Sequence, residues 1–171
     1  PSTWPSELTE IWSVEVGTSY GTPIVVGNDI FQHARQGEDE VVWKLDRTTG
    51  EVHWRKSFAV PFKVAGGGEY HGKGPKSCPA YADGRLFTLS IDGTLTAWKA
   101  STGEQIWQRN YEEKFGKCYP NWGASTSPIV DDNRVIVHFG TDDAGVLVAL
   151  DTASGKEVWK HGEDGASYSS P

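Results

Sequence analysis

Two long segments without a regular strand pattern, 59–77 and 112–126, carry the side chains best suited to binding a ligand or a partner. They contribute aromatic rings, amines, an imidazole and an amide: Tyr70, His71, Lys73, Lys76, Lys117, Tyr119, Asn121 and Trp122. Binding residues concentrate on loops that a rigid scaffold holds in place, so these eight side chains form the candidate binding site. They also fit a solvated rim without a ligand, and the sequence leaves both interpretations open.

Patterns that would indicate catalysis or metal binding are weak. The Gly66-Gly67-Gly68 run is followed neither by Gly-Lys-Ser/Thr nor by the start of a helix, so it does not predict a phosphate-binding loop. The five histidines are scattered, and no Ser-His-Asp or paired-carboxylate arrangement stands out. Cys78 and Cys118 are too few for a tetrahedral zinc site. We therefore predict no catalytic residue and no metal ligand, and the cysteines form either one disulfide or two free thiols.

Composition and charge narrow the class of protein. The chain has 171 residues, 37% of them hydrophobic, and 16 Lys and Arg against 23 Asp and Glu give a formal net charge of −7. This acidic balance disfavours duplex nucleic acid or an anionic membrane surface as a partner. No run of about 18 apolar residues predicts a membrane span, and no signal peptide begins the chain. A globular fold with a packed core is expected.

A repeat of about 50 residues, longer than a single hairpin, organises the chain. Similar segments with a central glycine and a final tryptophan occur at 45–54, 98–107 and 150–159, and a second series ends in proline at 21–23, 77–79, 127–128 and 170–171. Short apolar or β-branched runs bounded by turn residues lie between them, for example at 85–90 and 134–139. No long window has helical periodicity. Each unit is predicted to contain four strands.

The repeated glycine and tryptophan have a mechanical interpretation. A tight turn between the third and fourth strands needs a positive φ, which glycine adopts without strain, and a preceding Asp or Thr can bond the turn amides. The tryptophan four residues later offers a flat ring to the next unit. We predict structural roles in turns and in docking between units for Gly50, Gly103, Gly155, Trp12, Trp54, Trp107 and Trp159. The second unit departs from the pattern, with Lys99 where its neighbours have Asp46 and Asp151.

Four-stranded units with this signature, in three tandem copies from about residue 8 to residue 171, resemble the pyrroloquinoline-quinone (PQQ)-type repeat of eight-bladed β-propellers. The resemblance implies an all-β propeller whose blades are four-stranded antiparallel sheets. The family includes quinoprotein dehydrogenases and, without a cofactor, an outer-membrane β-barrel assembly lipoprotein. It also implies a periplasmic or otherwise exported protein.

Counting strands predicts an open arc of about three complete blades with partial blades at either side, because the smallest closed propellers have about four blades. The predicted division is an N-terminal extension (1–7), the outer strand of a preceding blade (8–17), blade 1 (18–58), a long rim loop (59–77), blade 2 (78–111), a second long rim loop (112–126), blade 3 (127–162) and the start of the next blade (163–171). The exposed ends imply that the partners are the remaining blades of the same protein or another copy of the chain.

The resemblance leaves several functions open, because catalytic and non-catalytic members share the repeat. A cofactor-free scaffold that binds protein or supports structure is the preferred hypothesis. The alternative is a PQQ-dependent alcohol or sugar dehydrogenase whose quinone and calcium are bound mainly by blades outside this chain. In that case Trp122 could stack on a ring and Asn121 could supply an oxygen. A third hypothesis is a propeller that binds carbohydrate through rim aromatics such as Tyr119 and Trp122.

The two cysteines gain a further interpretation from the resemblance. In much of the dehydrogenase family a disulfide between adjacent cysteines caps the quinone, and Cys78 and Cys118 are too far apart in sequence to form that cap. Both would lie on one rim, on neighbouring blades, and a disulfide would persist in an exported protein. A Cys78–Cys118 disulfide is therefore one expectation, and two separate free thiols are the other.

Overall fold

The computed structural model describes residues 7–64 and 68–171, which form three four-stranded antiparallel sheets. The strands of the first sheet are β1 (Ile24–Val26), β2 (Asp29–Gln36), β3 (Asp39–Asp46) and β4 (Val52–Ala59). Those of the second are β5 (Ala80–Ala82), β6 (Arg85–Leu89), β7 (Leu95–Lys99) and β8 (Glu104–Arg109). Those of the third are β9 (Ile129–Asp131), β10 (Arg134–Gly140), β11 (Gly145–Asp151) and β12 (Glu157–His161). Most of the expected 1–7 extension and of the Gly66–Gly68 run lies outside the described residues.

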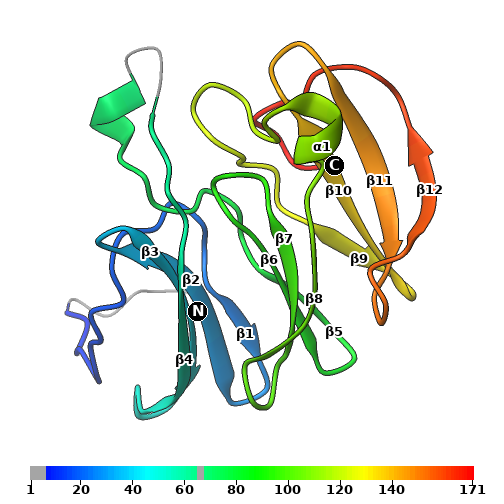
Figure 1. Cartoon of the computed structure of the whole chain (residues 1–171). Helices are drawn as coiled ribbons and strands as arrows, with labels where there is room; N and C mark the ends of the chain where they lie inside the picture. The colour runs from blue at the N-terminus through cyan, green and yellow to red at the C-terminus, as the bar shows by residue number, and fades with distance from the viewer. Residues whose placement is uncertain (1–6, 65–67) are drawn as a thin grey trace.

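The strands of each sheet follow chain order, and the sheets follow one another across the molecule from blue-teal through green to yellow-red (Figure 1). We call them blades 1, 2 and 3. Two short helical turns, η1 (Gly68–His71) and α1 (Glu112–Phe115), lie in the connections between blades. The predicted all-β architecture of four-stranded antiparallel blades in an open arc is confirmed. Within the described ranges, no helix has the length and apolarity needed to cross a membrane.

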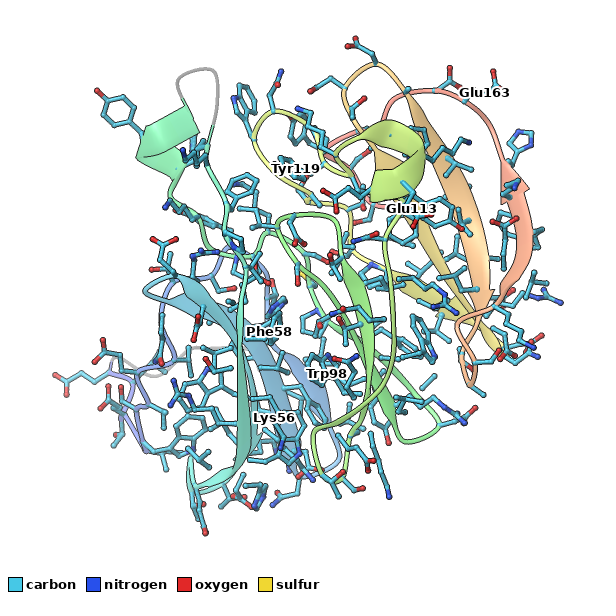
Figure 2. All side chains as sticks on the ribbon, viewed as in Figure 1. Lys56, Phe58, Trp98, Glu113, Tyr119 and Glu163 are labelled. Carbon is cyan, nitrogen blue, oxygen red and sulfur yellow. The ribbon has the colours of Figure 1, made fainter. Side chains whose placement is uncertain are left out.

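The hydrophobic core lies between the blades. Blades 2 and 3 enclose the largest cluster, which includes Phe87, Leu89, Leu95, Trp107, Val135, Val137, Phe139, Val146, Val148 and Leu150. Between blades 1 and 2, Phe31 and Val42 pack with Leu86 and Trp98. Full burial of such a side chain stabilises the fold by about 1.5–3 kcal/mol, so each blade depends on its neighbours. Figure 2 shows Phe58 and Trp98 at this junction, and their ring centroids are 5.5 Å apart.

Trp12, Trp54 and Trp107 each lie on the turn glycine of the following blade. A Cβ atom on Gly155 would come within 2.6 Å of the Trp107 ring, and Trp107 Nε1 donates to the Thr152 carbonyl at 3.0 Å. The same two contacts join Trp12 to Gly50 and Arg47, and Trp54 to Gly103 and Ala100. Glycine is therefore required in this turn for two reasons. Gly155 has a φ of +65°, and its lack of a side chain leaves space for the Trp107 ring. Trp107 is only 7% exposed, whereas Trp159 is 37% exposed.

The acidic residue that opens two of these turns bonds the turn amides, as expected. Asp46 Oδ1 accepts hydrogen bonds from the backbone N–H of Thr49 (2.8 Å) and Thr48 (2.7 Å), and these bonds lower the pKa of Asp46. The hydroxyl and amide of Ser154 lower the pKa of Asp151 in the same way. In blade 2, Gly103 N still donates to Lys99 O at 2.8 Å. The turn therefore forms without the carboxylate.

Candidate functional site

The candidate binding residues lie on the connections β4–β5 and β8–β9, at one end of the blades (Figure 1). These two connections pack against the β6–β7 turn. Val60 and Phe62 lie against Ile91 in one buried cluster, and the Phe62 and Tyr119 rings meet edge to face at 5.0 Å. Ala124 N donates to Ile91 O at 2.8 Å. The β6–β7 turn thus holds both long connections on one rim, with Tyr119 packed into it.

Three aromatic rings from three successive connections form a row on this rim. The His71 and Trp122 ring centroids are 6.3 Å apart, and those of Trp122 and Tyr168 are 5.3 Å apart. Trp122 is 45% exposed and Tyr168 is 44% exposed. We call His71, Trp122 and Tyr168 the aromatic row. Its Trp122 and Tyr168 rings offer half-exposed surface on the rim.

The carboxylate of Asp142, in the β10–β11 turn, anchors the aromatic row. Its Oδ2 accepts from Asn121 N at 2.8 Å, and its Oδ1 accepts from the Tyr168 hydroxyl at 3.2 Å. Trp122 N donates to the same hydroxyl oxygen at 3.4 Å. Burial raises the pKa of Tyr168, and the nearby charge of Asp142 raises it further. Tyr168 therefore stays protonated at neutral pH and keeps its bond to Asp142.

The other predicted rim residues are not part of the row. The lysines make contacts within the chain: Lys73 Nζ with Glu38 Oε1 (3.2 Å), Lys117 Nζ over the Tyr119 ring (5.4 Å) and Lys76 Nζ over the Tyr20 ring (5.3 Å). Burial lowers the pKa of Lys76. Tyr70 is 97% exposed. Of the eight candidates, the structure joins His71 to Trp122 and fixes the backbone of Asn121 beside them.

Tyr168 and Asp142 were not among the predicted site residues. A signal for Tyr168 exists in the sequence, because Gly165-Ala-Ser-Tyr168-Ser-Ser-Pro171 repeats the pattern of Gly17-Thr-Ser-Tyr20-Gly-Thr-Pro23. The segment 17–23 leads into β1 of blade 1. Asp142 has no comparable signal, since it lies in an ordinary hairpin turn.

A buried charged cluster beneath the rim was also missed. His33 Nε2 lies 2.8 Å from Glu40 Oε2, and the two side chains are 1% and 0% exposed. Glu40 Oε1 accepts a hydrogen bond from Ile91 N of blade 2 at 3.0 Å and lies 4.0 Å from Arg35 Nη1. The hydrogen bond from Ile91 N to Glu40 joins blade 1 to the β6–β7 turn.

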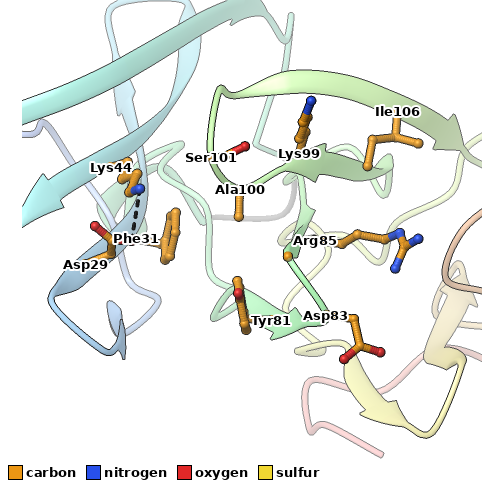
Figure 3. A pocket seen from close by; sticks show the side chains of 11 residues that line it. Asp29, Phe31, Lys44, Tyr81, Asp83, Arg85, Lys99, Ala100, Ser101 and Ile106 are labelled. Atoms are coloured by element: carbon orange, nitrogen blue, oxygen red, sulfur yellow. Dashed lines mark ion pairs between the residues drawn. The ribbon is translucent and has the colours of Figure 1, made fainter.

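A cavity of about 490 Å³ opens between blades 1 and 2 at the end opposite the rim (Figure 3). The rings of Phe31 and Tyr81 line it with centroids 6.0 Å apart, and Lys44 Nζ pairs with Asp29 Oδ2 at 2.9 Å. Blade 2 has Gly84 in its first turn where blades 1 and 3 have asparagine, and a Cβ on Gly84 would meet nothing within 4 Å. Gly84 is one of the residues that line this cavity.

Of the two alternatives for the cysteines, the structure has two free thiols and not the Cys78–Cys118 disulfide. Cys118 is 3% exposed in the cluster between blades 2 and 3, where burial raises its pKa to about 11. Cys78 lies elsewhere, at the start of blade 2, and its Sγ accepts from Thr22 N at 3.2 Å. The two cysteines therefore lie in different surroundings: Cys118 is in the cluster between blades 2 and 3, and Cys78 is beside Thr22.

Trp122 and Asn121, the two residues that the quinone alternative would use, have partners within the chain. Trp122 has His71 and Tyr168 as ring neighbours, and Asn121 is bonded to Asp142 through its backbone. Across residues 7–64 and 68–171, no three or more His, Cys, Asp and Glu side chains converge as metal ligands. The geometry on the rim instead suits contact with ring faces and the atoms beside them.

Comparisons of sequence identify relatives with this repeat. The family model for "Outer membrane protein assembly factor BamB" matches residues 38–170. The 1-butanol dehydrogenase (cytochrome c) of Thauera butanivorans is 31% identical over 150 residues, which are 82% of this chain and 20% of that protein. Quinohemoprotein alcohol dehydrogenase ADH-IIG of Pseudomonas putida is 27% identical over 90% of this chain and 21% of its own length. The chain spans about a fifth of these curated relatives.

Comparisons of structure show the same fold. Europium-containing methanol dehydrogenase aligns with a TM-score of 0.64 and 23% identity, covering 87% of this chain and 26% of that one. BamB from Moraxella catarrhalis aligns with a TM-score of 0.57 and 17% identity, covering 85% and 37%. With more than half of the chain matched by the family model, the protein belongs to the BamB-like family of PQQ-repeat β-propellers.

Proposed function

We propose that this chain is part of a cofactor-free propeller that binds a protein partner through its rim, in an exported compartment. The observation that carries the proposal is the aromatic row, whose rings are half exposed yet fixed by Asp142 and by one another. Aromatic side chains dominate protein-binding hot spots. Rings that are held before binding lose little conformational entropy when a partner arrives. The match to an assembly-factor family agrees with a binding role.

The row suits an extended segment of the partner better than a deep small-molecule site. Its rings lie side by side over three connections, and the neighbouring Tyr70 ring is 97% exposed. An extended peptide with apolar or aromatic side chains at alternate positions would place them over successive rings.

The test is binding of fluorescently labelled extended peptides with alternating aromatic residues, measured by fluorescence polarisation with the protein. We expect Trp122→Ala to weaken binding at least tenfold. The matched control is Tyr81→Ala, which removes a 36% exposed ring at the opposite end of blade 2. Equal affinities of the wild type and Trp122→Ala, or an equal loss in both variants, would refute the proposed rim site. Competition by oligosaccharides would point instead to carbohydrate.

A second candidate function is quinone-dependent alcohol oxidation. The specific observation in its favour is the 31% identity with 1-butanol dehydrogenase (cytochrome c). In this candidate the quinone and its metal would be held mainly by other blades of the protein. Dye-linked alcohol oxidation after addition of PQQ and calcium to the protein tests this candidate. Activity that survives Trp122→Ala would separate it from the rim proposal.

We also propose that the outer face of blade 3 is covered by a further blade of the same protein or by a second copy. Val158 is 51% exposed and Trp159 is 37% exposed on β12, where the equivalent Trp107 is buried by blade 3. Sedimentation of the 171-residue chain should show association. A stable 18.7 kDa monomer would count strongly against it.

A further inference from the structure

The two ends of the aromatic row carry opposite charge. The row begins at His71, in the connection between blades 1 and 2, and ends at Tyr168, beyond blade 3. The connection that holds His71, residues 60–77, has three lysines and one glutamate. The segments around Tyr168, residues 140–150 and 162–171, have four acidic residues and no lysine, arginine or histidine. A partner that lies along the row therefore meets a different charge at each end.

The acidic residues at the Tyr168 end come from the β10–β11 turn and from the segment after β12: Asp142, Asp143, Glu163 and Asp164. We call these four residues the acidic group. Backbone hydrogen bonds hold the two segments together, because Gly145 N donates to Glu163 O at 3.2 Å and Ala166 N donates to Thr141 O at 2.8 Å. All four residues are exposed, and Figure 2 shows Glu163 on this part of the rim.

Three carboxylates of the acidic group are available to a partner. Asp142 is used inside the chain, where it accepts hydrogen bonds from Asn121 N and from the Tyr168 hydroxyl. The side chains of Asp143, Glu163 and Asp164 make no ion pair with another described residue. The last ring of the row therefore lies beside uncompensated negative charge.

A hollow of about 320 Å³ lies beside His71, at the other end of the row. Its lining residues are Lys63, Val64, Gly72 and Lys73. Lys73 Nζ lies 3.2 Å from Glu38 Oε1, whereas Lys63 is exposed, so the Lys63 amine is the one offered to a partner. We call this space the lysine hollow. Its charge suits an acidic side chain.

The spacing of the rings suits an extended chain that reaches both ends. Neighbouring ring centroids in the row are 6.3 and 5.3 Å apart. Side chains on one face of a β-strand recur about every 6.6–6.8 Å, so alternate side chains of a bound segment can meet successive rings. The next side chain on the same face then lies past the row, toward the lysine hollow at one end and toward the acidic group at the other.

We propose that the partner segment carries an acidic side chain at one end, apolar or aromatic side chains in the middle and a basic side chain at the other end. The lysine hollow receives the acidic side chain, and the acidic group receives the basic one. This inference rests on the proposed rim function and specifies the chemistry of the partner. Since like charges repel, the two ends also determine the direction in which the segment lies.

The test uses four labelled peptides with blocked termini and two tryptophans at alternate positions. They differ only in the two end side chains, which are one Glu and one Lys, two Lys, two Glu, or two Gln. Fluorescence polarisation measures their affinity for the 171-residue chain. We expect the Glu/Lys peptide to bind about two- to fivefold more tightly than the other three. The difference should disappear in about 1 M salt, where the Debye length is about 3 Å.

Variants of the protein identify which end acts on which charge. Asp143→Asn combined with Glu163→Gln should weaken binding of the Lys-containing peptides about two- to fivefold and leave the Gln peptide unchanged. The matched control is Asp131→Asn combined with Asp132→Asn, which removes the same charge from the exposed turn at the opposite end of blade 3.

The lysine hollow is tested in the same way. Lys63→Gln should weaken binding of the Glu-containing peptides about twofold and leave the Gln peptide unchanged. Its control is Lys156→Gln, in an exposed turn at the end of blade 3 opposite the rim.

The outcomes separate this inference from the rim function on which it rests. Equal affinity of all four peptides, or an equal loss in the two double variants, would overturn the inference and leave the rim function intact. Tighter binding of the two-Lys peptide than of the Glu/Lys peptide would also overturn it, because the acidic group would then act without the lysine hollow. If none of the four peptides binds, or if Trp122→Ala changes none of their affinities, the rim function itself fails.

Discussion

Replacing Gly155 by alanine tests how the blades are joined. The added Cβ would lie 2.6 Å from Cδ2 of Trp107, a ring that is 7% exposed and cannot move into solvent without losing its burial. Alanine at positive φ costs about 1 kcal/mol by itself. Displacing the ring removes the Nε1–H bond to Thr152, worth about 1 kcal/mol, and part of the 3–5 kcal/mol that truncating a buried tryptophan costs. We expect a loss of about 3–4 kcal/mol.

The matched control is Gly27→Ala. Gly27 has a φ of +61°, close to the +65° of Gly155, but a Cβ on Gly27 would meet nothing within 4 Å. Its expected cost is therefore the backbone term alone, about 1 kcal/mol. Urea unfolding followed by circular dichroism measures both values. If the two variants lose equal stability, or if Gly155→Ala remains more costly than Gly27→Ala in a Trp107→Ala background, the docking explanation is refuted.

Further expectations concern the tryptophans, the thiols and the turns. Trp107→Ala should lower the free energy of unfolding by about 3–5 kcal/mol, and Trp159→Ala, whose ring is 37% exposed, by much less in the same denaturation assay. A thiol reagent at pH 8 should label Cys78 of the native protein before Cys118, because burial raises the pKa of Cys118 to about 11. After unfolding, the reagent should label two thiols per chain, and no increase in labelling on unfolding would contradict the burial of Cys118. The pKa of Asp151 is lowered in the fold, so its ionised form stabilises the protein at pH values above the ordinary aspartate pKa of 3.8. The loss in free energy of unfolding caused by Asp151→Asn should therefore shrink as the pH falls below that value, and a loss that does not change with pH would refute this explanation.

Local sequence was enough to predict the repeat and its turns. The glycines at positive φ, the strand-forming runs and the bonds from Asp46 and Asp151 to turn amides all involve residues close in sequence. The need for space at Gly155 was missed, since it arises from Trp107 of the preceding blade. Such a contact depends on how two sheets face each other, which a turn pattern does not contain.

The site was predictable only in part. Loop composition pointed to His71 and Trp122, and these two rings do meet. The bond from Asn121 N to Asp142 and the bond from Ile91 N to Glu40 join residues 21 and 51 positions apart, and no sequence motif marks the partners. The two alternatives for Cys78 and Cys118 could not be separated from sequence for a similar reason, because shared membership of a rim does not determine where a side chain points.

The tryptophan-on-glycine contact has a consequence for how such proteins change in length. Every junction uses the same donor and the same acceptor, so the last strand of any unit can meet the turn of any other. A gene duplication or deletion that spans one whole repeat would therefore leave each indole facing a glycine, with no compensating substitution required. A duplication or deletion that begins or ends inside a repeat would leave one tryptophan ring without its turn glycine.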